Sequence, residues 1–222
     1  MFTHVQMEHV LPELECITQP TGRVYVTPEG KKYPSITTVL GELSKDGIKQ
    51  WRAKVGEAEA NKISTQASVR GTAVHKLAED YLNNNPDWQQ GAMPANIFSF
   101  NTIKPILDAR VNNIWKQEIP LYSDRLEIAG RVDCIAELDG VLTIIDFKTS
   151  RKAKKKEWIQ NYFMQGTFYA AAFFERTGVA IKQTAIIIAV DGDNPQLFVE
   201  PVSDYLAPLH DARKNYRNIY GF

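Results

Sequence analysis

The sequence predicts an α/β fold in which a mixed β-sheet is flanked by helices. Three features of the chain predict it. Residues 35–117 follow mostly helical periodicity, whereas alternating apolar and polar residues take over after Glu118. A two-residue hairpin signal, Asp139-Gly140, joins two strand-like runs. A long apolar helical stretch at 157–177 then separates this hairpin from two further strand-like runs, a succession typical of α/β folds.

The composition is that of an ordinary soluble globular protein, with 44% apolar and 23% charged residues among 222. No stretch reaches the roughly 20 apolar residues that cross a bilayer, and the N-terminus lacks the features of a secretory signal. Cys16 and Cys134 lie 118 residues apart, which argues against a disulfide framework, a zinc ribbon or an iron–sulfur cluster. We therefore expect a cytoplasmic protein, as in a bacterial or phage-infected cell, that is neither secreted nor membrane-bound.

The first half of the chain divides into two regions. Residues 1–34 predict a β-hairpin region with short strands at 14–18 and 23–27, separated by Gln-Pro-Thr-Gly and followed by the turn Thr-Pro-Glu-Gly. Residues 35–117 predict a helical block packed over one end of the sheet. Its expected helices are 36–43, 48–65, 69–82 and 97–117.

The second half, 118–222, predicts the core of the fold, and 35–222 is expected to form one compact unit. Residues 126–138 alternate so that one face is apolar and the other carries Arg131, Asp133 and Glu137, which indicates a strand with one buried face. The returning strand is 141–148. A helix at 157–177, ended by Gly178, then leads to strands at 184–190 and 196–200 and a helix at 204–220.

Three charged residues of the hairpin form the chemical centre that the sequence predicts. Residues two apart on a strand point the same way, so Asp146 and Lys148 project together at the end of an apolar run. The tight turn pairs positions whose numbers sum to 279, which places Asp133 opposite Asp146. Two carboxylates so close repel each other unless a cation lies between them, and carboxylate oxygens suit Mg²⁺ or Mn²⁺. The alternative is an ordinary surface hairpin with salt bridges.

These residues belong to motifs that resemble those of RecB-like PD-(D/E)XK nucleases. The matching segments are Gly71-Thr-Ala-Val-His75, Gly130-Arg-Val-Asp133, Asp146-Phe-Lys148-Thr-Ser and Gln165-Gly-Thr-Phe-Tyr169. Tyr33-Pro-Ser-Ile-Thr37 and Tyr122-Ser123 are similar to segments of one branch, the mitochondrial genome maintenance exonucleases and their bacteriophage relatives. Val132 stands where the proline of the nominal motif would be, and the second acid is aspartate. The branch of the family that binds an iron–sulfur cluster is disfavoured by the two cysteines.

The resemblance implies a restriction-endonuclease-like core and a role for each matching residue. Asp133, Asp146, Lys148, Gln165 and Tyr169 would be catalytic. The metal would be held by His75, Asp133, Asp146 and the backbone carbonyl of Phe147. Structural roles remain open for His75 on the apolar stripe of its helix and for Gln165 and Tyr169 beside core aromatics. Glu118 is a further carboxylate near the site, and Glu79 is expected to be solvated.

Nucleic-acid contacts must come from local charge, because the formal net charge is zero. Five of the six residues at 151–156 are basic and directly follow the catalytic strand, where they would meet phosphates. The expected nucleic-acid-binding residues are Ser35, Trp51, Arg70, Arg151, Lys152, Lys154, Lys155 and Lys156. The alternatives are a solvated lysine face and a core position for Trp51.

Together these observations predict a metal-dependent DNA exonuclease that degrades single strands from a free end. The helical block would cover the site and admit only a strand that threads in. Replication or recombination proteins are the expected partners besides DNA. A structure-selective or nicking endonuclease with the same chemistry, and a non-catalytic nucleic-acid-binding module, are the alternatives.

Overall fold

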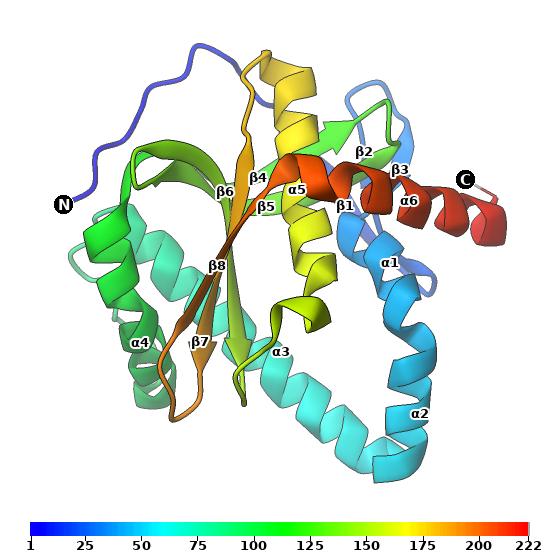
Figure 1. Cartoon of the computed structure of the whole chain (residues 1–222), viewed down its shortest axis with the longest axis horizontal. Coiled ribbons are helices and arrows are strands. Elements are labelled where there is room, and N and C mark those ends of the chain that lie inside the picture. Colours follow the sequence, from blue (N-terminus) through cyan, green and yellow to red (C-terminus); the bar gives the residue numbers. More distant parts are fainter. Residues whose placement is uncertain (222) are drawn as a thin grey trace.

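The computed structural model describes residues 1–221. It contains two sheets (Figure 1). The smaller sheet has the strands β1 (Glu15–Gln19), β2 (Gly22–Val26) and β3 (Lys32–Pro34). The larger has the order β4-β5-β6-β7-β8, with β4 (Val111–Ser123), β5 (Ile128–Leu138), β6 (Val141–Ser150), β7 (Gln183–Val190) and β8 (Gln196–Pro201).

Six α-helices and three short 3₁₀ turns complete the described part of the chain. The helices are α1 (Ile36–Gly41), α2 (Lys45–Val55), α3 (Glu57–Leu82), α4 (Pro94–Arg110), α5 (Gln160–Thr177) and α6 (Leu206–Tyr220). The 3₁₀ turns are η1 (Glu42–Ser44), η2 (Lys156–Trp158) and η3 (Val202–Tyr205). No helix among residues 1–221 is long and apolar enough to cross a membrane.

The large sheet is mixed because of one connection. Strands β4, β5 and β6 form an antiparallel meander, and β7 pairs antiparallel with β8. Between them β6 and β7 are parallel, which requires a crossover, and α5 supplies it. The prediction of a mixed sheet flanked by helices is confirmed.

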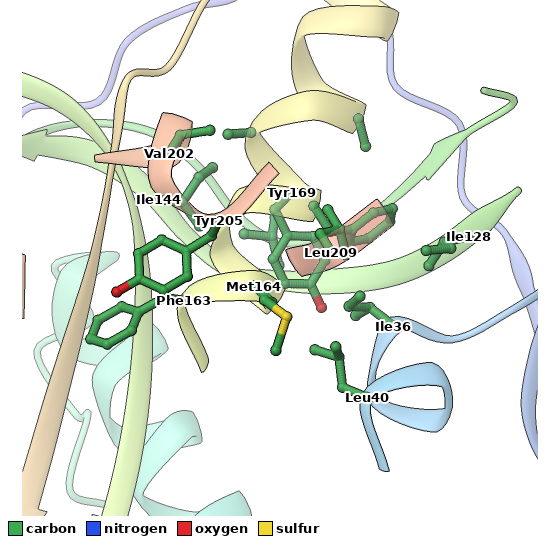
Figure 2. Packing of buried hydrophobic residues seen from close by; sticks show 14 of the residues in the cluster. Ile36, Leu40, Ile128, Ile144, Phe163, Met164, Tyr169, Val202, Tyr205 and Leu209 are labelled. Carbon is green, nitrogen blue, oxygen red and sulfur yellow. The ribbon is translucent and has the colours of Figure 1, made fainter. Parts of the chain in front are cut away.

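Helices cover both faces of this sheet (Figure 1). On one face, α1, α5 and α6 pack around residues such as Ile128, Ile144 and Phe163, some of which Figure 2 shows. On the other face, α3 and α4 pack against Ile145 and Phe147. The prediction that strand 126–138 buries only one face is therefore wrong, since strands covered on both sides carry apolar residues on both faces. Ala129 and Ile135, on the face expected to be polar, are buried.

The small sheet packs against one end of the large one. Leu14, Tyr25 and Tyr33 form a buried cluster with Tyr122 of β4 and Ala129 of β5. Strand β3, which the sequence did not predict, leads directly into α1, and Ser35 between them forms a bridge with Ala129. The small sheet thereby fixes where α1 begins.

Two helix boundaries differ from the sequence prediction. The helix expected at 97–117 ends at Arg110, and residues 111–117 belong to β4. There Val111 pairs with Leu138 and Ile114 with Ala136, so pairing with β5 overrides the helical pattern. The helices expected at 48–65 and 69–82 are replaced by α2 and a continuous α3, because the chain breaks at Gly56, whose φ is 87°.

Helix α2 and residues 57–70 of α3 stand away from the sheet and meet at an apex (Figure 1). We call these two segments the arch. Helix α2 buries no residue, and Ala60 is the only buried residue of 57–70. Arg52 pairs with Glu57 across the corner between the helices. The arch therefore keeps its shape with little support from a hydrophobic core.

Residues 2–5 run beside strand β4, and we call them the strap. The backbone N–H of Ile114 donates to the carbonyl of Thr3 at 2.7 Å, and Val5 donates to the carbonyl of Ile114 at 2.8 Å. The backbone N–H of Phe2 donates to Oδ1 of Asn84 at 2.7 Å. The strap thus pairs with the outer edge of the large sheet.

Candidate active site

The hairpin of β5 and β6 has the register that the sequence predicted. Cys134 lies opposite Ile145 and Leu138 opposite Val141, as the sum of 279 requires. Regular pairing ends there, next to Asp133 and Asp146. Beyond this point the backbone N–H of Phe147 donates to Oδ2 of Asp133 at 2.9 Å. The Asp133 side chain is therefore tied to the strand that carries Asp146.

Asp146 and Lys148 form an ion pair facing α5, in which Asp146 is buried and Lys148 is partly exposed. The ammonium group of Lys148 contacts Oδ2 of Asp146, and Nε2 of Gln165 donates to Oδ1 at 3.0 Å. The Asp146 side chain is only 2% exposed. Burial raises the pKa of Asp146 to about 6, with the Lys148 charge acting in the opposite direction. Burial alone would lower the pKa of Lys148, but the charges of Asp146 and Asp133 hold it above its ordinary value.

His75 approaches the same place from α3, on the other side of the sheet. Its Nε2 lies 2.5 Å from the carbonyl oxygen of Phe147, and its Nδ1 lies 3.4 Å from Oδ2 of Asp133. The structure thus brings three of the predicted metal-binding groups together: the imidazole of His75, the Asp133 carboxylate and the Phe147 carbonyl. Asp146 lies next to them in β6.

Glu118 is the further carboxylate that the sequence placed at the opening of the strand before the hairpin. It lies within β4 rather than at the start of a strand, and its φ of 47° is in the left-handed region. One oxygen of Glu118, one nitrogen of His75 and one oxygen of Asp133 lie within 4.8 Å of one another. Burial, followed by the Asp133 charge, raises the pKa of Glu118 to about 7. Recognising residues 111–123 as one strand would have placed Glu118 within it. The sequence instead predicts the first seven of these residues as helix.

A cleft of about 590 Å³ joins these groups to the surface. Besides His75, Glu118, Asp133 and Lys148, its lining includes Ser35, Thr72, Glu79, Gln165 and Tyr169. The Tyr169 hydroxyl donates to the carbonyl of Arg131 at 2.6 Å, and burial raises its pKa well above the ordinary value. A Cβ at Gly130 would lie 2.9 Å from the Tyr169 hydroxyl oxygen, so this close approach requires glycine. Ser35 caps α1, its Oγ accepting a hydrogen bond from Thr38 N at 3.1 Å.

Four of the eight predicted nucleic-acid-binding residues line a second cleft, of about 620 Å³. They are Arg70 of α3 and Arg151, Lys152 and Lys154, which follow β6. We call this the basic cleft. Arg70 is paired there with Asp191, which also lines it. Helix α3 contributes residues to both clefts, Arg70 to the basic cleft and His75 to the active-site cleft.

The remaining predicted contacts are dispersed. Lys155 lies over the ring of Trp158, 5.3 Å from its centroid, and Lys156 pairs with Glu200 at 2.7 Å. Trp51 is half-buried on α2 and is absent from the lining of both clefts. Ser35 lines the active-site cleft rather than the basic one.

The donor groups fit a hard divalent cation. Carboxylates and a backbone carbonyl are the oxygen ligands that Mg²⁺ accepts, and an imidazole among them favours metals such as Mn²⁺. Without a cation, the Glu118 and Asp133 carboxylates lie close together, and the Asp133 charge also helps to raise the pKa of Asp146. A divalent ion would relieve this repulsion.

A mixed sheet with an acidic residue on one hairpin strand and Asp-x-Lys on the next defines a restriction-endonuclease-like protein. The sequence model of the PD-(D/E)XK nuclease superfamily matches residues 49–196, which is 148 of the 222 residues. The chain belongs to this superfamily, as its motifs predicted.

Curated relatives are more distant. The chain is 25% identical over 129 residues to mitochondrial genome maintenance exonuclease 1 of Mus musculus, a match that covers 54% of this chain and 38% of the relative. It is 26% identical over 145 residues to the same protein of Homo sapiens, covering 61% and 40%. The chain thus spans about two fifths of the length of these relatives.

A solved structure is also similar: a protein of Eubacterium rectale named as a candidate exonuclease. It has a TM-score of 0.43 and 19% sequence identity, covering 69% of this chain and 65% of that one.

Proposed function

We propose that this protein is a metal-dependent nuclease that hydrolyses DNA from a free end, with preference for single strands. One observation carries the proposal: Lys148, which is paired with the buried Asp146, lines one cleft together with His75, Glu118 and Asp133. Superfamily membership and the similarity to two exonucleases support it.

Each side chain has a role that follows from its contacts. Asp133, Asp146, His75 and the Phe147 carbonyl would hold the metal, which supplies polarisation of the phosphodiester and acidification of a bound water. Lys148, 20% exposed at the cleft, would stabilise the negative charge that develops on the phosphate. Gln165 is a positioning residue, because its amide holds Oδ1 of Asp146. Tyr169 positions β5 through the carbonyl of Arg131.

DNA as the substrate is supported by the basic cleft. Arg151, Lys152 and Lys154 offer positive charge directly beyond the catalytic strand, and Arg70 adds a guanidinium from the neighbouring helix. Such groups bind the phosphate backbone without regard to sequence. A strand that leaves the active-site cleft would meet them on the other side of α3.

The requirement for a free end is supported by the arch. Helices α1 and α3 both contribute residues to the active-site cleft, and α2 connects them away from the sheet (Figure 1). A strand that reaches His75 between these helices would have to thread past α2. Trp51, the aromatic residue of α2, is half-buried and lines neither cleft, so stacking on a passing base would require its side chain to turn into the passage.

Two DNA substrates of the same sequence test this proposal. One is a linear single strand and the other a covalently closed single strand, each incubated with Mn²⁺ or Mg²⁺. We expect the linear strand to be degraded and the circle to be spared, with no cleavage in EDTA. Labels at the 5′ and 3′ ends would give the polarity. Cleavage of the circle at the same rate would favour an endonuclease, and no cleavage of any substrate would favour a binding module.

We also propose that residues 35–222 act as one compact unit, with the helical block supplying His75 and the 118–222 core the remaining ligands. A cytoplasmic setting and association with replication or recombination proteins accord with a DNA end as the substrate. Limited proteolysis would test the unit: we expect first cuts in the arch and no stable fragment that lacks α3.

A further inference from the structure

We propose that Glu118 is a metal ligand of this site, together with His75 and Asp133. The proposal rests on the proposed function, since it concerns the same metal. It adds a third acidic side chain to a centre whose sequence motifs assign only Asp133 and Asp146.

The geometry of the three groups fits one ion. Their ligand atoms come from α3, β4 and β5 and lie within 4.8 Å of one another. Mg²⁺ binds oxygen at about 2.1 Å, so two ligands on opposite sides of the ion lie about 4.2 Å apart. Neighbouring ligands of an octahedral ion lie closer, at about 3 Å, so modest side-chain movements would bring the three atoms onto one ion. The Phe147 carbonyl, 2.5 Å from Nε2 of His75, is next to the same point.

Glu118 is available for a cation, in contrast to Glu79, the other glutamate that lines the cleft. Glu79 is held by Lys76 at 3.2 Å. Among the described residues, no group donates a hydrogen bond to the Glu118 carboxylate, although it is partly buried beside Asp133. A partly buried carboxylate beside a like charge is stabilised when a cation binds between the two.

The backbone at Glu118 supports the same conclusion. A glutamate at a φ of 47° adopts a conformation that L-residues seldom take, and such conformations persist where the surroundings hold them. Here the guanidinium of Arg131 binds the Glu118 carbonyl. This contact maintains the turn of the backbone that directs the side chain toward His75 and Asp133.

Calorimetric titration of the full chain with Mn²⁺ tests the assignment without relying on cleavage. We compare the wild type with Glu118→Gln, which keeps size and hydrogen-bonding capacity, and with Glu79→Gln as the matched cleft carboxylate. We expect Glu118→Gln to weaken Mn²⁺ binding by about tenfold or more, and Glu79→Gln by less than threefold.

Thermal melts provide the second readout. Metal-free Glu118→Gln should melt at or above the wild-type temperature, because a charge near Asp133 is removed. The temperature gain on adding Mn²⁺ should be smaller than in the wild type, because stabilisation by a ligand grows with its affinity. Mn²⁺ affinity within twofold of the wild type would overturn the role of Glu118 and leave the proposed function intact. A wild type that binds no Mn²⁺ would overturn both.

Discussion

Lys148 is partly buried, pairs with Asp146 and lies 5.0 Å from the centroid of the Tyr162 ring. We predict that Lys148→Ala lowers kcat by about two orders of magnitude, because stabilisation of developing charge is lost. DNA affinity should stay within a few-fold, since the transition state is affected more than binding. Single-turnover cleavage and filter binding measure the two effects, with the exposed Lys182→Ala as the control. Cleavage at the wild-type rate would remove Lys148 from the mechanism.

The two carboxylates with raised pKa values make the metal-free protein sensitive to pH. Glu118 shifts from 4.5 to about 7 and Asp146 from 3.8 to about 6, so the folded state binds protons more tightly than the unfolded state. Their contribution to stability is complete at low pH and is lost as the pH rises through 6 to 7. In EDTA the melting temperature should therefore rise when the pH is lowered from 8 to 6.

Divalent metal should change this dependence. Ligands must be deprotonated to bind a cation, so the stabilisation by Mg²⁺ or Mn²⁺ should be larger at pH 8 than at pH 6. Thermal melts of the wild type and of Glu118→Gln, with and without metal at both pH values, test this prediction. They separate the contribution of Glu118 to the pH dependence from that of other titrating groups. A wild type and a variant with identical pH dependence in EDTA would contradict the assignment of the effect to Glu118.

At the residue scale, the sequence predicted the side-chain positions that follow from the two-residue period of a strand. A two-residue turn and an apolar run suffice to bring Asp133 and Asp146 to neighbouring positions on paired strands. The proximity of His75 to Phe147 was implied by a family motif, because the packing of α3 on β6 has no local signal. Glu118 was only a possible extra carboxylate, since its direction depends on a positive φ and on Arg131, which periodicity does not reveal.

At the scale of elements, the packing of α5 against β7 depends on one glycine. A Cβ at Gly166 would lie 1.9 Å from Oγ1 of the buried Thr184. We predict that Gly166→Ala destabilises the fold by about 1–3 kcal/mol, the usual cost of overpacking. It should also displace Gln165, and with it Asp146, so activity should fall more than a melting curve alone suggests.

Gly71 is the matched control because it lies in the interior of α3 with open space around its Cβ position. Gly71→Ala should stabilise the protein by about 0.5–1 kcal/mol, the difference in helix propensity. Urea unfolding of both variants measures these opposite shifts. Equal effects of the two substitutions would mean that α5 does not pack as closely on β7 as described.

The element boundaries that the sequence missed have a common physical cause. Residues 111–117 have no strong strand pattern, and their conformation is determined by pairing with β5, which is distant in sequence. In the same way, β3 is only three residues long and depends on β2. Long periodic segments such as α5, by contrast, were predicted within a few residues because their own pattern determines them.

At the scale of the whole molecule, the formal net charge is zero, so attraction to DNA would come from local groups of basic residues such as the basic cleft. We predict that neutralising Arg151, Lys152 and Lys154 together weakens binding to single-stranded DNA and flattens its dependence on salt. The slope of log affinity against log salt should fall by roughly 0.7 for each phosphate that the variant no longer binds. Binding isotherms at several salt concentrations measure it, with the exposed pair Lys182 and Lys214 neutralised as the control. An unchanged slope would mean that the basic cleft does not bind phosphate.

The strap beside β4 affects how the molecule behaves at high concentration. β4 is an outer strand of the large sheet, and the unpaired backbone of an outer strand is a template for pairing with another chain. Residues 3–5 occupy the N–H and carbonyl of Ile114, and the register shifts between Asn112 and Lys116 interrupt the flat edge beside it.

Removing the strap should therefore cause self-association rather than local unfolding. We expect a chain without residues 1–6 to retain its helical circular dichroism but to elute from a sizing column at increasing apparent mass as its concentration rises. A truncated chain that stays monomeric would show that the register shifts alone protect the edge. Without the strap, the concentration of the protein itself would therefore decide whether the chain stays monomeric.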